Sequence, residues 1–248
     1  MFDKIKFHQL KAIRQLKRLR DRQLVELRNL TEKQQQTLLQ FAEKLGINLN
    51  KSLKQEFYRK IIHVSSLWIT LLIYFVDAKA AIYAFCVLLF GDLFLEYGNY
   101  KKWKWARKTF GLIFYRIMRD AERKKDVFQP TGGMYVLLAT ILCLILFSKE
   151  VAIVSLTVML VSDTCAALFG RVYGMRKIIK HKSTEGVLAF LVSALLVMVA
   201  TNFIVPVTYA SIVACICATL VEMFDEKVKI DDNVSIPLVV GIILTLLV

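Results

Sequence analysis

Residues 151–186 read VAIVSLTVMLVSDTCAALFGRVYGMRKIIKHKSTEG, and this stretch indicates both the fold class and the position of the polar chemistry. The apolar run 151–169 contains one charged residue, Asp163, and leads into a loop rich in lysine and arginine. This pattern is typical of a membrane-spanning helix that leaves the bilayer on its cytoplasmic side. Asp163 would lie about 10 Å from the helix end, and an ionised carboxylate at that depth indicates a functional site.

The rest of the chain repeats the alternation of apolar runs and basic blocks. Hydrophobic residues make up 56% of the 248 residues, the net charge is +14, and the mean hydropathy of +0.51 exceeds that of an ordinary soluble domain. Blocks of charge between apolar runs favour a membrane protein over a nucleic-acid-binding protein, so we expect no nucleic-acid partner. We expect an all-α, polytopic membrane protein with about seven transmembrane helices, some extended by polar ends, in the runs 61–76, 79–96, 134–147, 151–169, 187–205, 208–223 and 234–248.

Two further segments are predicted to be helices that do not cross the bilayer. In residues 1–50, leucine and isoleucine recur every three residues from Leu10 to Leu19 among many basic residues. This basic amphipathic helix suits either an anionic membrane surface or packing against another helix. Residues 103–118 mix aromatic and basic side chains and are expected to form an interfacial helix. We therefore expect a cytoplasmic N-terminal helix over 1–50 and a transmembrane catalytic domain over 51–248.

The distribution of charge predicts which side of the membrane holds the chemistry. With the basic N-terminus inside, the basic loops 97–133 and 170–186 are also inside, as the positive-inside rule requires. The helix count then places the acidic loop 224–233 on the same side. Because acids and bases from distant parts of the chain meet at one face, we expect an integral membrane protein with a cytoplasmic active site. The membrane would be the bacterial inner membrane or the endoplasmic reticulum.

The loop after Asp163 predicts a phosphate site. Its cations include Arg171, Lys177 and Lys182. The next span opens directly afterwards, and backbone N–H groups at a helix start attract phosphate oxygens. A carboxylate such as Asp163 or Glu185 would hold the Mg²⁺ of a triphosphate. The spacing is not that of a P-loop.

Three other polar clusters are predicted at the same face. The first has Glu56, Arg59, Lys60 and His63 on one helical face, as either an interfacial anchor or part of the site. The second is the turn 130–133, PTGG, either an anion-binding nest or a plain turn. The third surrounds the start of the last span, where hard oxygen ligands favour a Mg²⁺ site over simple charge balance: Glu222, Asp225, Asp231, Asp232 and Asn233. Asp92 and Glu96 end the second run at this face, with their role open.

These residues resemble the family of dolichol kinases, phytol kinases and CTP-dependent diacylglycerol kinases, the polyprenol kinase family. The family's CTP-binding motif, DxxAxxxGxxxGxxKxxxxK[ST]xEG, matches at every position: Asp163, Ala166, Gly170, Gly174, Lys177, Lys182, Ser183, Glu185 and Gly186. The ExxRKxxH segment at 56–63 and the DDNxxIP segment at 231–237 are also similar to family features. The resemblance covers residues 54–248, and the layout around 147–174 is most similar to the diacylglycerol kinase branch.

The resemblance implies transfer of the γ-phosphoryl group of CTP, with a divalent metal, to the hydroxyl of a membrane lipid alcohol: diacylglycerol, phytol or a polyprenol. It implies that Asp163 ligates metal or orients the lipid hydroxyl, and that His63 is a second candidate for the base. The implied nucleotide-binding residues are Gly170, Arg171, Gly174, Lys177, Lys182, Ser183, Glu185 and Gly186, with Arg59 and Lys60. The implied metal ligands are Asp163, Glu185, Glu222, Asp225, Asp231 and Asp232, and Lys182 joins Asp163 and His63 as a catalytic residue.

Two other functions fit parts of the sequence. A phosphatidate cytidylyltransferase also binds CTP and Mg²⁺ beside a lipid, but its usual motif has a proline before the lysine-threonine pair. Here His181 precedes Lys182, which favours a kinase. A membrane transporter or scaffold would use Asp163 as a coupling site, but the sequence has no inverted repeat to support a transporter. The oligomeric state is left open.

Overall fold

The computed structural model describes residues 51–106, 108–109, 128, 130–179, 182–224 and 230–247. The described residues all belong to the unit Lys51–Val248. The predicted amphipathic helix over 1–50 lies outside the described residues. So does most of the predicted interfacial segment 103–118, of which residues 104–106 and 108–109 are helical.

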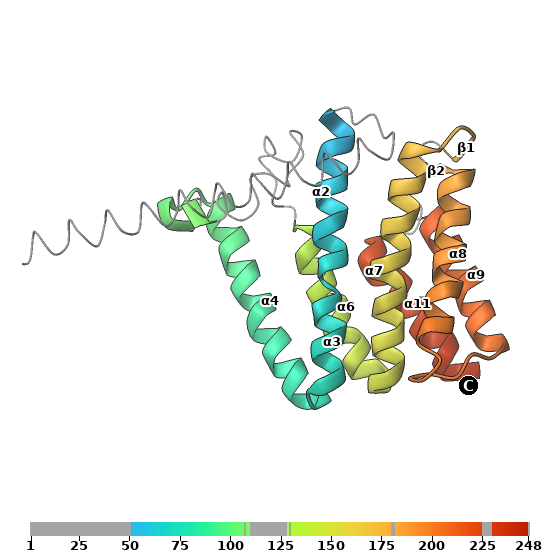
Figure 1. Ribbon diagram of the computed structural model, residues 1–248. Helices are drawn as coiled ribbons and strands as arrows, with labels where there is room; N and C mark the ends of the chain where they lie inside the picture. The colour runs from blue at the N-terminus through green and yellow to red at the C-terminus, as the bar shows by residue number, and fades with distance from the viewer. Residues whose placement is uncertain are drawn as a thin grey trace, which may run out of the picture. The chain divides into compact units, whose positions relative to one another are not determined.

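The all-α prediction is confirmed for the described part of the chain, which contains eight helices and one short hairpin (Figure 1). The helices are α2 (Lys51–Ser65), α3 (Leu67–Phe75), α4 (Ala78–Tyr100), α6 (Gly132–Leu146), α7 (Lys149–Val172), α8 (Thr184–Ala200), α9 (Tyr209–Met223) and α11 (Asp232–Leu247). The hairpin pairs β1 (Lys177–Ile179) with β2 (Lys182–Ser183) in antiparallel fashion. It lies in the basic loop after α7, where no strand was predicted.

Two of the described helices are long and apolar enough to cross a bilayer, α4 with 23 residues and α7 with 24. Each reaches roughly 35 Å at the α-helical rise, more than the ~30 Å of a hydrocarbon core. The apolar helices α6, α8, α9 and α11 are shorter. With 15 to 17 residues each, they reach only about 23–26 Å. A membrane protein is therefore supported, but the prediction of about seven spans is not shown.

Helix α7 lies at the centre of the bundle, in contact with α2, α3, α6, α8 and α11. Of its apolar window 72% is buried, against 11% for α4. Small buried residues such as Ala152, Ser155 and Ala166 let the neighbouring helices approach α7 closely. Helix α4 instead exposes large side chains, including Tyr83, Val87 and Phe90. Such a surface is typical of a helix that faces lipid.

The two ends of the bundle differ in character. Short connections join α3 to α4 and α6 to α7 at the lower end in Figure 1. There Asp77 caps α4 by accepting the N–H of Lys79 at 3.0 Å, and Lys149 Nζ donates to the carbonyl of Tyr74 at 3.1 Å. The upper end holds the start of α2, the end of α7 and the hairpin. The charged side chains that the sequence singled out gather towards that upper end.

Candidate functional site

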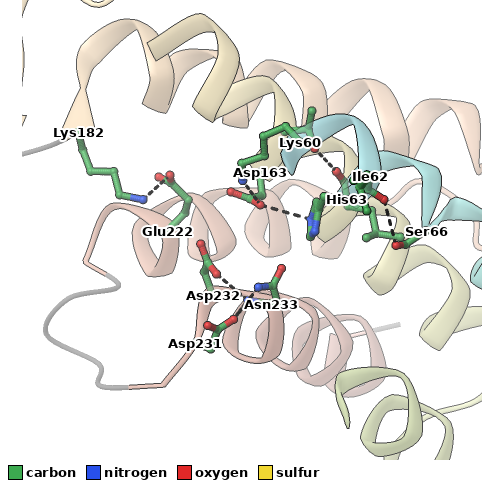
Figure 2. Close-up of polar contacts among 12 residues, drawn as sticks. Lys60, Ile62, His63, Ser66, Asp163, Lys182, Glu222, Asp231, Asp232 and Asn233 are labelled. Carbon is green, nitrogen blue, oxygen red and sulfur yellow. Dashed lines mark hydrogen bonds and ion pairs between the residues drawn. The ribbon is translucent and has the colours of Figure 1, made fainter. Parts of the chain in front are cut away.

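The fold brings together charged side chains from five separate elements (Figure 2). We call them the polar cluster: Lys60 and His63 on α2, Asp163 on α7, Lys182 on β2, Glu222 on α9, and Asp231 and Asp232 at the start of α11. All seven were predicted site residues. Their side chains meet because α2 and α11 both pack against the central helix α7, which places distant segments of the chain side by side.

Asp163 is the centre of the cluster and is held by two side chains of α2. Lys60 Nζ donates a hydrogen bond to Asp163 Oδ2. His63 Nε2 lies 3.3 Å from the same oxygen, within ion-pair range but not aligned as a hydrogen bond. Lys60 and His63 both reach Asp163 because residues three apart share one face of a helix. The charge of Arg59 acts on both His63 and Asp163.

The pair of Lys60 and Asp163 is almost completely removed from water. Their side chains are 4% and 8% exposed, and that of His63 is 12% exposed. Burying a charge costs several kcal/mol unless an opposite charge compensates it. The geometry supplies that compensation at close range, because the Lys60 ammonium group lies against the Asp163 carboxylate.

A second ion pair links the basic hairpin to α9. Lys182 Nζ donates to Glu222 Oε1 at 2.6 Å. The Glu222 side chain is 5% exposed, whereas that of Lys182 is 24% exposed. Lys182 thus stays accessible to a ligand from outside, and Glu222 fixes the direction in which its ammonium group points.

The start of α11 forms a tight carboxylate turn. The N–H of Asn233 donates to Asp231 Oδ1 at 3.0 Å and to Asp232 Oδ1 at 2.9 Å, and its side-chain Nδ2 donates to Asp231 Oδ1 at 2.6 Å. Asn233 is buried, and its Oδ1 has no hydrogen-bond partner among the described residues. Figure 2 shows that Oδ1 points towards Asp163 and His63.

The acidic side chains of the cluster face one another. Burial, and after it the negative charges of Asp163 and Asp231, raise the pKa of Asp232 to about 7. Lys60 and Lys182 oppose this rise, because their positive charges also reach Asp232. The cluster has four carboxyl groups against Lys60, Lys182 and the nearby charge of Arg59, an arrangement that suits a further cation.

The donor atoms fit Mg²⁺ only if a phosphate completes its coordination. Within the described ranges, no group of three or more His, Cys, Asp or Glu side chains is arranged to hold a metal ion. However, Mg²⁺ usually takes one or two carboxylates and fills its other positions with water and substrate phosphates. Asp231, Asp232 and the unpartnered Oδ1 of Asn233 are hard oxygen donors of that kind.

The other predicted metal ligands have different surroundings. Asp163 is engaged by Lys60 and His63, and Glu222 by Lys182. Backbone N–H groups of Glu185 itself, Met175 and Arg176 lower the pKa of Glu185, and its Oε2 has no hydrogen-bond partner among the residues that the structure describes. The remaining predicted ligand, Asp225, lies outside the described residues.

The glycines of the motif lie where α7 and α8 pack together. A β-carbon on Gly174 would lie 2.0 Å from the carbonyl oxygen of Gly170, and one on Gly186 would lie 3.0 Å from that of Ala166. Ser183 caps α8 by accepting the N–H of Gly186 at 3.1 Å and donates to the Gly170 carbonyl at 3.4 Å. These residues therefore have a packing role, and their contact with phosphate stays a prediction.

Two further predicted cations lie in the segment between Asp163 and Lys182. Arg171, in the last turn of α7, and Lys177, at the start of β1, are both exposed. The sequence also assigned no role to several buried polar groups. Ser162, beside Asp163, has a hydroxyl without a hydrogen-bond partner in the described part, as does Ser235 on α11. An uncharged serine in an apolar run gives little signal, whereas Asn233 was already named with the acidic residues around the last span.

The chain is similar both to an uncharacterized protein and to proteins with named activities. An uncharacterized protein of Rickettsia prowazekii is 31% identical over 183 residues, covering 73% of this chain and 88% of that protein. CTP-dependent diacylglycerol kinase 1 of Saccharomyces cerevisiae is 32% identical over 162 residues, 62% of this chain and 53% of the yeast protein. Probable phytol kinase 1, chloroplastic, of Glycine max is 30% identical over 138 residues, 49% of this chain and 46% of the plant protein.

The chain thus spans about half the length of the two kinases. No family profile matches it, and no solved structure does. The sequence similarity extends to a diacylglycerol kinase and to a phytol kinase, and it covers most of the Rickettsia protein. The chain is therefore a distant homologue of the CTP-dependent diacylglycerol kinases and phytol kinases of the polyprenol kinase family.

Proposed function

We propose that this protein is a lipid kinase that transfers the γ-phosphoryl group of CTP to the hydroxyl of a membrane lipid alcohol. Its family and the motif through Lys182 support this assignment. The single observation that carries it is the polar cluster, in which Lys60, Asp163 and His63 lie buried beside Lys182 and Asp232. Phosphoryl transfer asks an enzyme mainly for positioning and charge neutralisation, and the cluster offers both.

The cationic residues would bind the triphosphate. Lys182 is the accessible lysine of the cluster, and its ammonium group is already oriented by Glu222. A preorganised donor stabilises developing charge without reorganising during the reaction. Arg171 and Lys177, exposed beside it, would add positive charge for the nucleotide. Each of these roles is the one that the resemblance to the family implies for that residue.

Asp163 and His63 would act on the lipid hydroxyl. The Asp163 carboxylate, paired with Lys60, can accept a hydrogen bond from the hydroxyl and orient it for attack. His63 lies 3.3 Å from that carboxylate and supplies an imidazole that would take the proton. The hydroxyl oxygen then forms the new bond to the γ-phosphorus, and the bond from that phosphorus to the β–γ bridging oxygen breaks, releasing CDP.

Asp231 and Asp232 would hold Mg²⁺ together with the phosphates. Bound there, Mg²⁺ would neutralise charge on the β- and γ-phosphates. Asn233 keeps the two carboxylates in place through its three hydrogen bonds. The excess of carboxylate charge around Asp232 supports this position over one at Glu185, whose charge is already offset by nearby backbone N–H groups and Arg176.

The acceptor is proposed to be diacylglycerol, phytol or a polyprenol, entering sideways between helices from the bilayer. The basic loop 170–186 supports a cytoplasmic position for the site in an integral membrane protein. The apolar surface of α4 supports contact with lipid. CTP as donor comes from the relatives that carry it in their names.

The test is a transfer assay with the purified protein in lipid nanodiscs. The protein is incubated with γ-labelled CTP, Mg²⁺ and a panel of diacylglycerol, phytol, dolichol and undecaprenol. We expect label in one lipid, loss of that label in Asp163→Asn, and retention in Lys149→Met, a change at the other end of the bundle. Label in pyrophosphate would instead indicate a cytidylyltransferase. Absence of label from both products, with the wild-type fold intact, would leave a transporter or scaffold.

A further inference from the structure

A carboxylate outside the polar cluster organises the start of α6. Glu96, in the last turns of α4, is 4% exposed. Its two oxygens accept the backbone N–H of Thr131 at 3.1 and 3.3 Å. Thr131 is the N-cap of α6, yet its own side chain does not cap the helix. The negative charge that a helix start favours is supplied here by a residue 35 positions earlier in the chain.

The start of α6 lies beside the carboxylate turn of α11. A β-carbon on Gly132, the residue after Thr131, would lie 3.9 Å from Nδ2 of Asn233. That same nitrogen donates to Asp231, at 2.6 Å. Tyr135, one turn further along α6, lies close enough to be acted on by the charges of both Asp231 and Glu96. Glu96 is therefore connected to the proposed metal and nucleotide site through one helix start and one side-chain amide.

We propose that Glu96 is a positioning residue, which fixes the start of α6 against Asn233 so that Asp231 and Asp232 keep the orientation that binds the metal–nucleotide complex. The inference rests on the proposed function for the identity of that complex. Residues that orient metal ligands from outside the coordination sphere typically change metal affinity by 10- to 100-fold. A residue that only caps α6 would instead change the amount of folded protein and leave metal affinity unchanged.

The variants separate these two roles. Glu96→Ala removes the acceptor, whereas Glu96→Gln keeps one side-chain oxygen that can accept the Thr131 N–H. Ser148→Ala is the matched control, because Ser148 caps α7 at the opposite end of the bundle by accepting the N–H of Val151 at 3.3 Å. All three proteins are purified in nanodiscs, and their folded fraction is measured by circular dichroism.

The first measurement does not depend on turnover: the rise in melting temperature on adding Mn²⁺ with CTP. We expect Glu96→Ala to need about tenfold more Mn²⁺ for the half-maximal rise. Glu96→Gln should need less than about threefold more, and Ser148→Ala should match the wild type. The second measurement is the Mg²⁺ concentration that gives half-maximal transfer, which should move in parallel for Glu96→Ala, with a smaller change in kcat.

Two results would overturn the inference: a wild-type Mn²⁺ response in folded Glu96→Ala, or no Mn²⁺ response in the wild-type protein itself. The outcome for the proposed function is separate. If Mn²⁺ and CTP stabilise the wild-type protein and this effect weakens in Glu96→Ala, the positioning role stands even where no lipid is labelled. In that case only the assignment as a kinase fails.

Discussion

Replacing Lys60 by methionine is the sharpest test of the buried centre of the cluster. The side chains of Lys60 and Asp163 are 4% and 8% exposed, so loss of the lysine leaves a carboxylate almost without water. Breaking a buried ion pair from one side costs about 3–5 kcal/mol. A Coulomb estimate agrees, since two unit charges about 4 Å apart in a medium of effective dielectric constant about 20 interact by ~4 kcal/mol.

Variants at Asp163 complete a double-mutant cycle with Lys60→Met. Asp163→Leu alone should also cost about 3–5 kcal/mol, because it leaves the ammonium group unpaired. The double variant of Lys60→Met and Asp163→Leu should recover most of the lost stability, since apolar residues of similar volume often replace a buried pair at little cost. It should still transfer no phosphate, because the carboxylate that orients the hydroxyl is gone.

The assay is the free energy of unfolding, from SDS titration of the protein in bicelles followed by circular dichroism, with transfer measured on the same samples. Lys149→Met is the control, because this half-buried lysine donates to the carbonyl of Tyr74 at the other end of the bundle, so its loss should cost about 1 kcal/mol or less. Single variants at Lys60 and Asp163 that cost no more than this control would refute the buried pair. Transfer by the double variant would refute the assigned role of Asp163.

Three further predictions test other parts of the site. Gly174→Ala should destabilise the protein by about 1–3 kcal/mol, because its β-carbon would meet the backbone of α7. Gly132→Ala is the control, because its β-carbon would make only ordinary contacts. Equal melting temperatures for the two variants would contradict the packing role of Gly174. Ser183→Ala should lower stability by about 1 kcal/mol through loss of the α8 cap, measured by the same titration, and an unchanged unfolding curve would argue against that cap. Lys182→Met should lower kcat/KM for CTP roughly a hundredfold. Glu222→Gln should lower kcat/KM less, because glutamine keeps an acceptor for the lysine. A larger loss of kcat/KM in Glu222→Gln than in Lys182→Met would exclude Lys182 as the phosphate ligand.

The helices were largely predictable because hydrophobicity is a local property of the chain. The run 151–169 became α7 with polar additions at both ends, and 208–223 became α9 almost unchanged. The run 187–205 was predicted less accurately, because helix α8 ends at Ala200 and the last residues of the run form turns. The number of spans was not settled by hydrophobicity, since several helices are shorter than a bilayer is thick.

The members of the site were also predictable, but their partners were not. Charged residues in or beside apolar runs stand out in the sequence, so Lys60, Asp163 and Lys182 were all named in advance. Nothing in the local pattern indicated that Lys60 pairs with Asp163, 103 residues away. Nor did it indicate that Glu222 orients Lys182, from 40 residues away. For the motif glycines, the resemblance implied a place in the nucleotide site, but nothing in the local pattern indicated how closely the residues of α7 and α8 meet there.

By itself, the sequence determined the all-α character, the position of most helices and the identity of the charged residues, because these depend on composition and spacing within short segments. The tertiary structure alone decided which charge neutralises which, and that Glu96 acts at the start of α6. The physical reason is that ion pairs and helix caps depend on distances of a few ångströms. For residues far apart in the chain, only the packing of helices around α7 sets those distances.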